Sequence, residues 1–404
     1  MASHAKAIQY EFGALTLDRI SNLPINVLHL ILERLPLHDA ARTSILSKTW
    51  RSTWELQGVL VFDDVFFSHL ASDVSATISH ILLVRSGPLF KFHLSIPLNL
   101  PVLHTDMWIK NISNRGVKIL KIFNNLQTSY RMPSYLFSCT ELTHLTLDNC
   151  ILNPPLGFKG FCNLSSVRLM YVMITADMSF GTQLETLDLK YCTGIKYLGG
   201  QFKCNSNIRK LIIADCGKIN WRWFEYTRNV ETLGLMFEKR SNCRRKIINL
   251  DRVVGNMPKI QVLLLGGLFL ERLTTTMENL TFLQLFHFGI YDLGQIQSFF
   301  ALIRSSPNLQ NLRIMLRPGL EEYLQLPNVD DVILGQIEKV DIQGMAGSRS
   351  ELSFIKFLLA SSPSLIWMKL SKSVTVTDPR EELRILGEVT RLPRASTTAQ
   401  IIWN

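Results

Sequence analysis

The chain contains seven cysteines and nine histidines that could take part in metal binding or catalysis. The cysteines are odd in number and far apart, and no two of them form a C-x-x-C pair. His29 and His38 lack the spacing of a metal-binding pair. The sequence also lacks G-x-G-x-x-G, G-x-x-x-x-G-K-[ST], H-E-x-x-H and G-x-S-x-G motifs. We therefore expect no catalytic residues, no metal site and no cofactor.

Three of the cysteines share a position in a recurring phrase of the form L-x-x-L-x-L. Cys150, Cys192 and Cys216 each follow the start of such a phrase by eight residues. A zinc site is one interpretation, but the paired spacing and nearby histidines that it requires are missing. The spacing favours buried structural thiols at a repeated turn.

The phrase occurs nine times between Val117 and Ile314, with starts 20 to 30 residues apart. This period is similar to that of leucine-rich repeats. Each phrase predicts a short strand whose apolar residues point into a core, while the alternating residues point outward. No single repeat can bury its own apolar face, so the repeats must stack.

Further elements are predicted on both sides of the repeats. Gly58–Phe67 and Pro88–Ile96 are typical of strands, with a helix between them. Asp378 and Pro379 form a helix start, and Leu383, Leu386 and Val389 extend its predicted apolar face. Two late segments, 298–314 and 353–370, share the same predicted order of a helix, Ser-Ser-Pro and a strand. Residues 399–403 are predicted to form a last strand.

Residues 18–54 form a short, strongly apolar segment ahead of the repeats. A first helix is predicted after Pro24 and ends at Leu35-Pro36, and Asp39 is the predicted N-cap of a second helix. Trp50 and Trp54 lie four residues apart, on one face of a third helix. Domains below about 40 residues seldom bury so much apolar surface alone. The segment must therefore meet the rest of the chain or another protein.

This segment closely resembles the F-box, through Leu23-Pro24, Leu35-Pro36, 39–44 and 46–51. The last two runs are similar to the plant form. The resemblance implies docking of a Skp-type adaptor and, through it, of cullin and RING subunits. The implied adaptor-binding residues are Leu23, Pro24, Val27, Ile31, Leu35, Pro36 and Trp50. A helical cap on the following domain is the alternative.

The end of the chain resembles the FBD domain, through 338–344, 351–356 and 394–396. Together the likenesses identify the chain as a member of the plant F-box/FBD/leucine-rich-repeat family. The expected fold is α/β: a three-helix F-box, then an irregular leucine-rich-repeat solenoid that ends in an FBD domain. The expected boundaries are a disordered tail at 1–15, an F-box at 16–57, repeats at 58–330 and an FBD domain at 331–404.

The outward positions of the predicted strands change in character along the chain. They are polar in the early repeats and largely apolar from Ile212 onward. An exposed apolar face needs a partner or a cover. Target binding and self-cover by the segment between Val230 and Ile260 both remain open. The candidate target-binding residues are Met236, Phe282, Phe286, Arg313, Met315, Trp367 and Lys369.

The net charge of +10 favours acidic partners in general but does not by itself indicate nucleic-acid binding. Five basic residues within 239–246 are typical of a nuclear-import signal, of an acidic-substrate contact or of a solvated charged loop. No secretory leader and no membrane span are evident. We expect a cytoplasmic or nuclear protein, or both, without membrane partners.

Taken together, these patterns predict the substrate-recognition subunit of an SCF-type (Skp–cullin–F-box) ubiquitin ligase. Such a protein would bind a Skp-type adaptor through the F-box and an unknown target through the repeats, leading to ubiquitination and proteasomal degradation. It would perform no bond chemistry itself. The alternatives are a ligand-dependent F-box sensor with a small-molecule pocket in the repeat face, or a repeat scaffold outside any ligase.

Overall fold

The computed structural model describes residues 20–70, 73–85, 87–97, 102–198, 207–216, 221–237, 247–248, 250–267, 269–270, 273–317 and 334–404. Two compact units divide the chain, Met1–Leu164 and Ser165–Asn404. The predicted disordered tail (1–15) and the basic cluster (239–246) lie outside the described residues.

Three α-helices and a short 3-10 helix open the first unit: α2 (Ile25–Arg34), α3 (Leu37–Arg42), η1 (Thr43–Ile45) and α4 (Lys48–Leu56). The three predicted helices are thus confirmed. The prediction that Asp39 caps the second helix is wrong, because α3 already begins after Pro36 and Asp39 lies in its first turn. Ser47 caps α4 by accepting the backbone N–H of Trp50 at 3.3 Å.

Ten further elements complete the first unit: β1 (Val59–Phe62), α5 (Asp64–Ser68), α6 (Val74–Val84), β2 (Lys91–Ile96), α7 (Val102–Ser113), β3 (Ile119–Asn124), β4 (Tyr130–Arg131), η2 (Ser134–Ser138), β5 (His144–Asp148) and β6 (Cys150–Leu152). The strand predicted over Gly58–Phe67 is shorter than expected, because β1 covers only Val59–Phe62. It stops at Phe62 because the Asp63 carboxylate accepts the N–H of Phe66 and so starts α5. Strands β1, β2, β3 and β5 are parallel neighbours in that order.

A buried arginine fastens the F-box helices to the rest of this unit. Arg85, at the end of α6, is 3% exposed and donates from Nη1 to the carbonyl of Trp54 at 2.9 Å. Its guanidinium also lies 4.9 Å from the centre of the Trp54 ring. Burial lowers the pKa of Arg85 to about 10, so the group stays charged at neutral pH. The end of α4 therefore has a fixed position against α6.

The second unit is built on parallel strands: β7 (Ser166–Met170), β9 (Thr186–Lys190), β10 (Lys210–Ala214), β11 (Thr232–Met236), β13 (Val262–Gly266), β15 (Phe282–Phe288), β16 (Asn311–Leu316), β17 (Lys339–Met345), β18 (Trp367–Lys372) and β19 (Gln400–Trp403). They pair side by side in chain order. Their registers align the phrases residue by residue, apart from irregularities near the ends of β15 and β17. The strands predicted from the phrase are confirmed.

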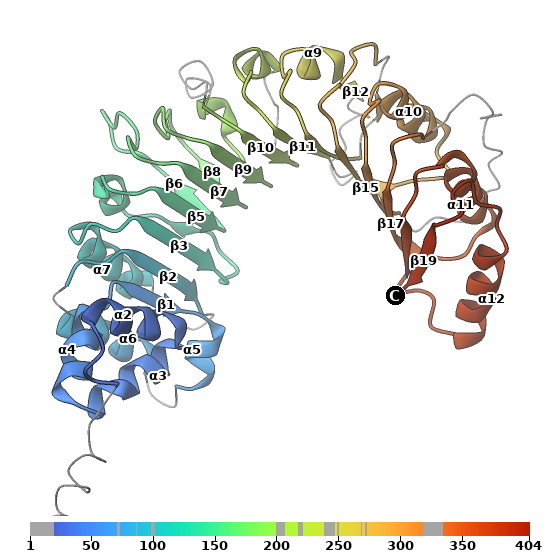
Figure 1. Ribbon diagram of the computed structural model, residues 1–404. Helices are drawn as coiled ribbons and strands as arrows, with labels where there is room; N and C mark the ends of the chain where they lie inside the picture. The colour runs from blue at the N-terminus through green and yellow to red at the C-terminus, as the bar shows by residue number, and fades with distance from the viewer. Residues whose placement is uncertain are drawn as a thin grey trace, which may run out of the picture. The chain divides into compact units, whose positions relative to one another are not determined.

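The remaining elements of this unit connect the strands: β8 (Met173–Ile174), η3 (Ile195–Leu198), η4 (Trp221–Tyr226), β12 (Ile247–Ile248), α9 (Leu250–Val254), β14 (Phe269–Leu270), α10 (Leu293–Arg304), α11 (Arg349–Ser361) and α12 (Pro379–Thr390). Helices α9, α10 and α11 lie on one face of the sheet, and α12 lies beside α11 (Figure 1). We call the opposite face of this sheet the outer strand face.

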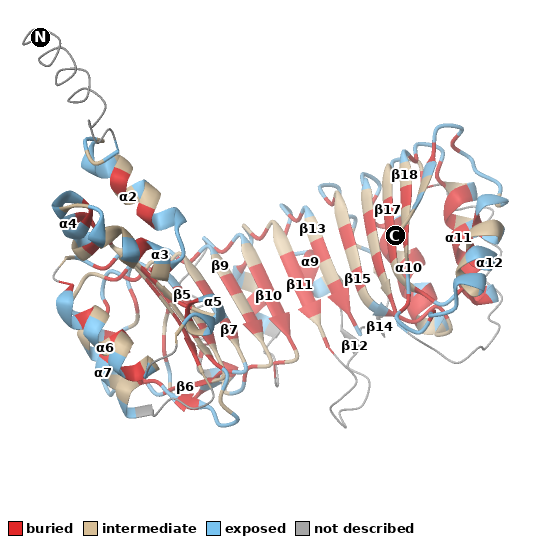
Figure 2. Ribbon diagram, turned by 90° about the horizontal axis from the view of Figure 1, so that it is seen from below, coloured by how far each residue is buried: buried red, intermediate tan, exposed pale blue. Residues whose placement is uncertain are grey.

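The core of the second unit consists of the inward residues of each phrase. Buried and half-buried residues alternate along most of the strands (Figure 2), whereas β10, β11 and β17 contain runs of buried residues. Leu187, Leu211, Leu233, Leu263 and Leu283 are all fully buried. This stacking is the arrangement that the period predicts.

The repeated cysteines are structural, as predicted. Cys150, Cys192 and Cys216 are free thiols and at most 1% exposed. The Cys192 thiol donates to the carbonyls of Leu169 and Lys190 at 3.4 and 3.3 Å. Burial raises the pKa of Cys150 to about 12, so this thiol stays protonated.

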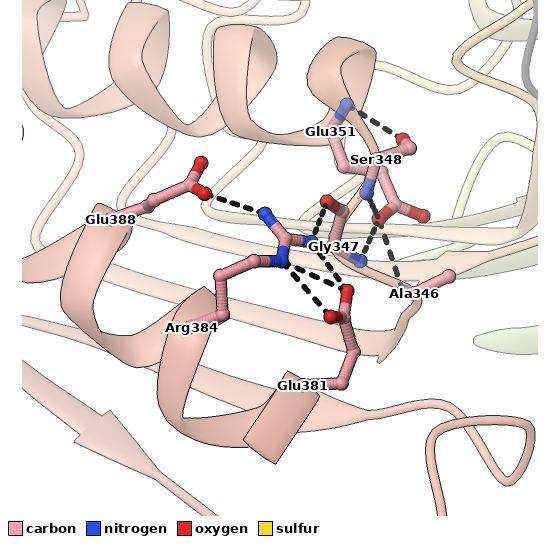
Figure 3. A network of polar contacts seen from close by, with 7 residues as sticks. All are labelled: Ala346, Gly347, Ser348, Glu351, Glu381, Arg384 and Glu388. Atoms are coloured by element: carbon pink, nitrogen blue, oxygen red, sulfur yellow. Dashed lines mark hydrogen bonds and ion pairs between the residues drawn. The ribbon is translucent and has the colours of Figure 1, made fainter. Parts of the chain in front are cut away.

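A buried glutamate organises the start of α11 (Figure 3). Its Oε2 accepts the backbone N–H groups of Ala346, Gly347 and Ser348 at 3.0, 2.7 and 3.0 Å. This residue, Glu351, also completes a capping box with Ser348. Burial raises the pKa of Glu351, and the three N–H groups oppose that shift. One carboxylate therefore satisfies three backbone donors.

Arg384 joins α12 to the same turn. Its Nη2 donates to the carbonyl of Gly347 at 3.0 Å, and its other nitrogens bind Glu381 and Glu388 (Figure 3). Asp378 caps α12 and Pro379 opens it, as predicted. The prediction that Leu383 lies on the apolar face of this helix is wrong. Leu383 is 69% exposed, because Ile385 and Val389, four residues apart, form the buried face instead.

We expect Glu351→Ala to lower stability by about 3 kcal/mol or more, because it leaves three backbone N–H groups without their acceptor in a buried turn. Hydrogen exchange of the amides in α11 and α12 should accelerate before global unfolding. Glu388→Gln is the control, since it loses only an exposed ion pair and should cost under about 1 kcal/mol. Equal exchange rates in the two variants would contradict this role of Glu351.

Candidate docking surfaces

The first candidate site is an apolar patch on the F-box helices. Ile45 and Leu46 are 80% and 67% exposed, and Ile25, Leu30 and Leu35 are 52%, 56% and 36% exposed. We call these five residues the F-box patch. Exposed aliphatic side chains of this kind are candidates for contact with another protein.

Local structure explains why the patch is exposed. Leu28 and Leu32 point from α2 into the helical core and are fully buried, so Leu30 falls on the other side of the helix, while Ile25 is the first residue of α2 and is exposed at its end. Ile45 and Leu46 lie between the end of α3 and the Ser47 cap of α4. The core of the F-box is thus complete without the patch.

The residues predicted to bind an adaptor divide into three groups. Pro24, Leu35 and Pro36 are exposed, and Leu23, Val27 and Ile31 are half-buried. Trp50 needs correction as a docking residue: it is 4% exposed, because α4 turns it into the helical core.

Sequence reasoning did not include Ile45 and Leu46 among the candidate docking residues, although both are strongly exposed. Helical periodicity assigns them to a second helix and its buried stripe, but α3 ends at Arg42. Ser47 could have given the signal, because a serine N-cap places the start of α4 at Lys48 and leaves the two preceding residues in a link.

The second candidate site is the outer strand face of the second unit. Its apolar centre lies on β11, β13 and β15, where Met236, Val262, Leu264, Phe282 and Phe286 are half-buried. Two glycines sit between them. A Cβ on Gly266 would lie 3.1 Å from Cβ of Phe286 and 3.3 Å from Cγ of Met236, so these larger side chains fill the space above it.

The seven residues predicted to bind a target all point outward and are half-buried: Met236, Phe282, Phe286, Arg313, Met315, Trp367 and Lys369. Arg313 already interacts with other residues of this chain. Its Nε donates to Oδ2 of Asp341 at 2.9 Å, and its guanidinium lies 5.8 Å from the centre of the Phe282 ring. Ile212, which also points outward, is 6% exposed because it covers Gly234.

The hollows that lie within single units include a small cavity and an open groove. A small cavity of about 30 Å³ beneath β13 and β15 is lined by residues such as Leu285 and Phe299. An open groove of about 730 Å³ lies in the first unit, between His29 and Glu33 of α2 and a surface that includes Phe90, Arg115 and Lys118. The cavity has room for little more than one water molecule.

Among the residues that the structure describes, no group of three or more histidines, cysteines or acids could hold a metal ion. In the same part of the chain, no helix combines the length and apolar character needed to cross a membrane.

Comparison with known proteins agrees with this architecture. Residues 20–62 match the model of the F-box domain, and residues 89–377 match the model described as At1g61320/AtMIF1, LRR domain. Two Arabidopsis thaliana relatives match nearly the whole chain. F-box/FBD/LRR-repeat protein At1g13570 is 29% identical over 96% of this chain and 98% of the relative. F-box/FBD/LRR-repeat protein At4g26340 is 25% identical over 96% of this chain and 100% of the relative.

Among solved structures, an internalin (inlF) from Listeria monocytogenes matches with 13% identity and a TM-score of 0.36, covering 82% of this chain and 94% of that one. A helical F-box followed by a parallel sheet of leucine-rich repeats defines the class of this mixed α/β protein. The chain belongs to the plant F-box/FBD/leucine-rich-repeat family.

Proposed function

We propose that this protein is the substrate-recognition subunit of an SCF-type ubiquitin ligase and has no catalytic activity of its own. The observation that carries the proposal is the F-box patch, whose five aliphatic residues stay exposed although the helices beneath them are fully packed. A Skp-type adaptor would cover Ile45 and Leu46 together with Pro24, Leu35 and Pro36. Cullin and RING subunits would follow through that adaptor.

The outer strand face would hold the target protein. Because one chain carries both surfaces, a bound target and the adaptor-bound ligase are tethered to each other. Tethering raises the effective concentration of a target lysine near the ubiquitin-charged enzyme, and this supplies the rate gain without bond chemistry in this chain. Ubiquitination of the target and its proteasomal degradation would follow, in the cytoplasm or the nucleus.

The division into F-box (16–57), repeats (58–330) and FBD domain (331–404) is part of this proposal. The FBD region contains the Glu351 turn and its link to Arg384, which give the last strands and helices a common anchor. This rigidity suits a region that completes the target-binding face.

Co-expression with a Skp-type adaptor and size-exclusion chromatography tests the proposal. We expect a stable complex of one chain with one adaptor. Elution of the folded chain apart from the adaptor would contradict the ligase function and favour a repeat scaffold. A small-molecule sensor remains the alternative, and its ligand pocket would have to lie elsewhere than in the cavity of about 30 Å³ beneath β13 and β15, because a typical ligand pocket measures roughly 300 Å³ or more.

A further inference from the structure

A first cluster of basic side chains lies on the outer strand face at β7, β9 and β10. Arg168, Lys190 and Lys210 surround Asp188, which pairs with Arg168 in the register of β7 and β9. Lys190 Nζ lies 3.8 Å from Oδ2 of Asp188, whose side chain is 15% exposed. Burial raises the pKa of Asp188, while the three cations oppose that shift. Three cations against one carboxylate leave two positive charges.

A second cluster lies at β16, β17 and β18. Asp341 is 6% exposed, and it accepts from Arg313 at 2.9 Å and from Gln343 at 3.1 Å. Lys339 lies two residues before Asp341, and Lys369 pairs with Asp341 in the register of β17 and β18. Three cations again face one carboxylate, which is already satisfied by its neighbours.

The apolar centre of the face lies between these clusters. In the register of the sheet, β9 and β16 are separated by five strand intervals, or about 24 Å at ~4.8 Å each. Three outward rows, about 6.6 Å apart along the strands, make a strip about 13 Å wide. An α-helix is ~10 Å across and covers ~24 Å in about 16 residues. The strip therefore has the dimensions of one helix.

The net charge is positive at both ends of this strip. Among the described residues that point outward from β7 to β18, the only acids are Asp188 and Asp341, and each is outnumbered by adjacent cations. Glu185, Glu231 and Glu338 precede their strands at the rim, where Glu231 is paired with Arg209 at 3.2 Å. An occupant with basic ends would meet like charges at both ends of the strip.

We propose that the outer strand face binds an amphipathic helix of a partner protein that has an apolar centre and acidic residues at both ends, about 16 residues apart. The proposal rests on the proposed function in one respect, since it names the class of target segment that the receptor would hold. The apolar stripe of the helix would lie on Val262 and Phe282, and its acidic ends on the two basic clusters.

The test is a display library of 24-residue helices with randomised end charges and a randomised centre, selected on the full chain. We expect the enriched sequences to carry Asp or Glu at both ends and aliphatic residues at i, i+3, i+4 and i+7 in the centre. Enrichment of basic or uncharged ends would overturn the proposal, and so would a failure to enrich any helix. A dT24 oligonucleotide that competes for the same lysines as strongly as the selected helices would also overturn it, because the site would then be a simple polyanion surface.

Charge reversal then locates the site. Lys190→Glu/Lys210→Glu and Lys339→Glu/Lys369→Glu should each weaken the best enriched peptide by about tenfold or more in fluorescence anisotropy. A peptide with the matching acidic end changed to lysine should regain affinity for the corresponding variant. The control, Arg304→Glu/Lys356→Glu, makes the same charge change at exposed positions on helices α10 and α11 and should leave affinity unchanged. Equal losses in the control, or no loss in the face variants, would place binding elsewhere.

These measurements do not require the adaptor. If the chain binds the acidic-ended helices but no Skp-type adaptor, the helix-binding proposal is supported and the proposed ligase function is contradicted. A chain that binds the adaptor but selects no such helix would do the reverse.

Discussion

Leu46→Asp and Ile45→Asp are each expected to weaken binding of a Skp-type adaptor by about a hundredfold or more. The two side chains are the most exposed aliphatic groups of the F-box patch, at 67% and 80%. Central apolar residues of an interface commonly contribute about 2 kcal/mol or more, and a buried unpaired carboxylate adds a further penalty. Leu35→Asp should act in the same direction, but less strongly, because this residue is 36% exposed. Isothermal titration against purified adaptor measures the change.

The interpretation depends on the variants staying folded. Since Ile45 and Leu46 contribute little to the helical core, the unfolding temperature should stay within a few degrees of wild type. Leu383→Asp is the matched control: it places the same charge on an equally exposed aliphatic residue of α12, and adaptor affinity should not change. Undiminished binding by all three F-box variants would remove the patch as the adaptor site.

Trp50 separates packing from docking in the same experiment. Because its side chain lies in the helical core, Trp50→Phe should lower stability through lost packing while the folded fraction keeps its adaptor affinity. The sequence motif alone includes this tryptophan among the docking residues, since a motif does not distinguish residues that touch the partner from residues that hold the touching ones in place.

The repeats show which features a sequence can predict. The leucines of each phrase define the strands because burial in a stacked core constrains those positions directly. The phrases also align the outward positions, so Arg168, Asp188 and Lys190 are predicted to share one face. That these residues form a basic cluster can be inferred only once neighbouring strands are known to pair in register. Only then do three cations from separate repeats surround one carboxylate.

The backbone conformation of the turn after each strand is difficult to predict from the sequence. The seventh residue after the start of a phrase has a positive φ in six of the nine repeats, namely Asn149, Tyr171, Tyr191, Asp215, Gly267 and His287, and Gly344 holds the same position after Ile337. Gly, Asn, Asp and His are residue types that favour the left-handed region, but Tyr171 and Tyr191 are not, so the turn leaves only a weak consensus. The left-handed conformation is imposed by the coil, and most residues tolerate it at a cost of about 1–2 kcal/mol. The stacked rings of Tyr171 and Tyr191, 4.7 Å apart, offset part of that cost.

At position 267 this turn strictly requires glycine. We expect Gly267→Ala to destabilise the second unit by more than about 3 kcal/mol. A Cβ at this position would lie 1.7 Å from the carbonyl oxygen of Phe237 in the preceding coil. The obstruction is backbone, so a change of side-chain rotamer cannot relieve it. The steric cost adds to that of placing alanine at a φ of +66°. Thermal unfolding followed by circular dichroism measures the loss.

Three other glycines separate the steric cost of an added Cβ from the conformational cost of a positive φ. Gly157 has a φ of +82°, but a Cβ added there would have no atom within 4 Å, so Gly157→Ala should cost only the conformational penalty of about 1–2 kcal/mol. Gly387 lies inside α12 with the same open space, and Gly387→Ala should stabilise the protein by about 0.5–1 kcal/mol. Gly194→Ala, where the Cβ would lie 1.8 Å from the carbonyl oxygen of Ile174, should match Gly267→Ala. If Gly267→Ala cost no more than Gly157→Ala, the close approach of neighbouring coils would not be what selects glycine there.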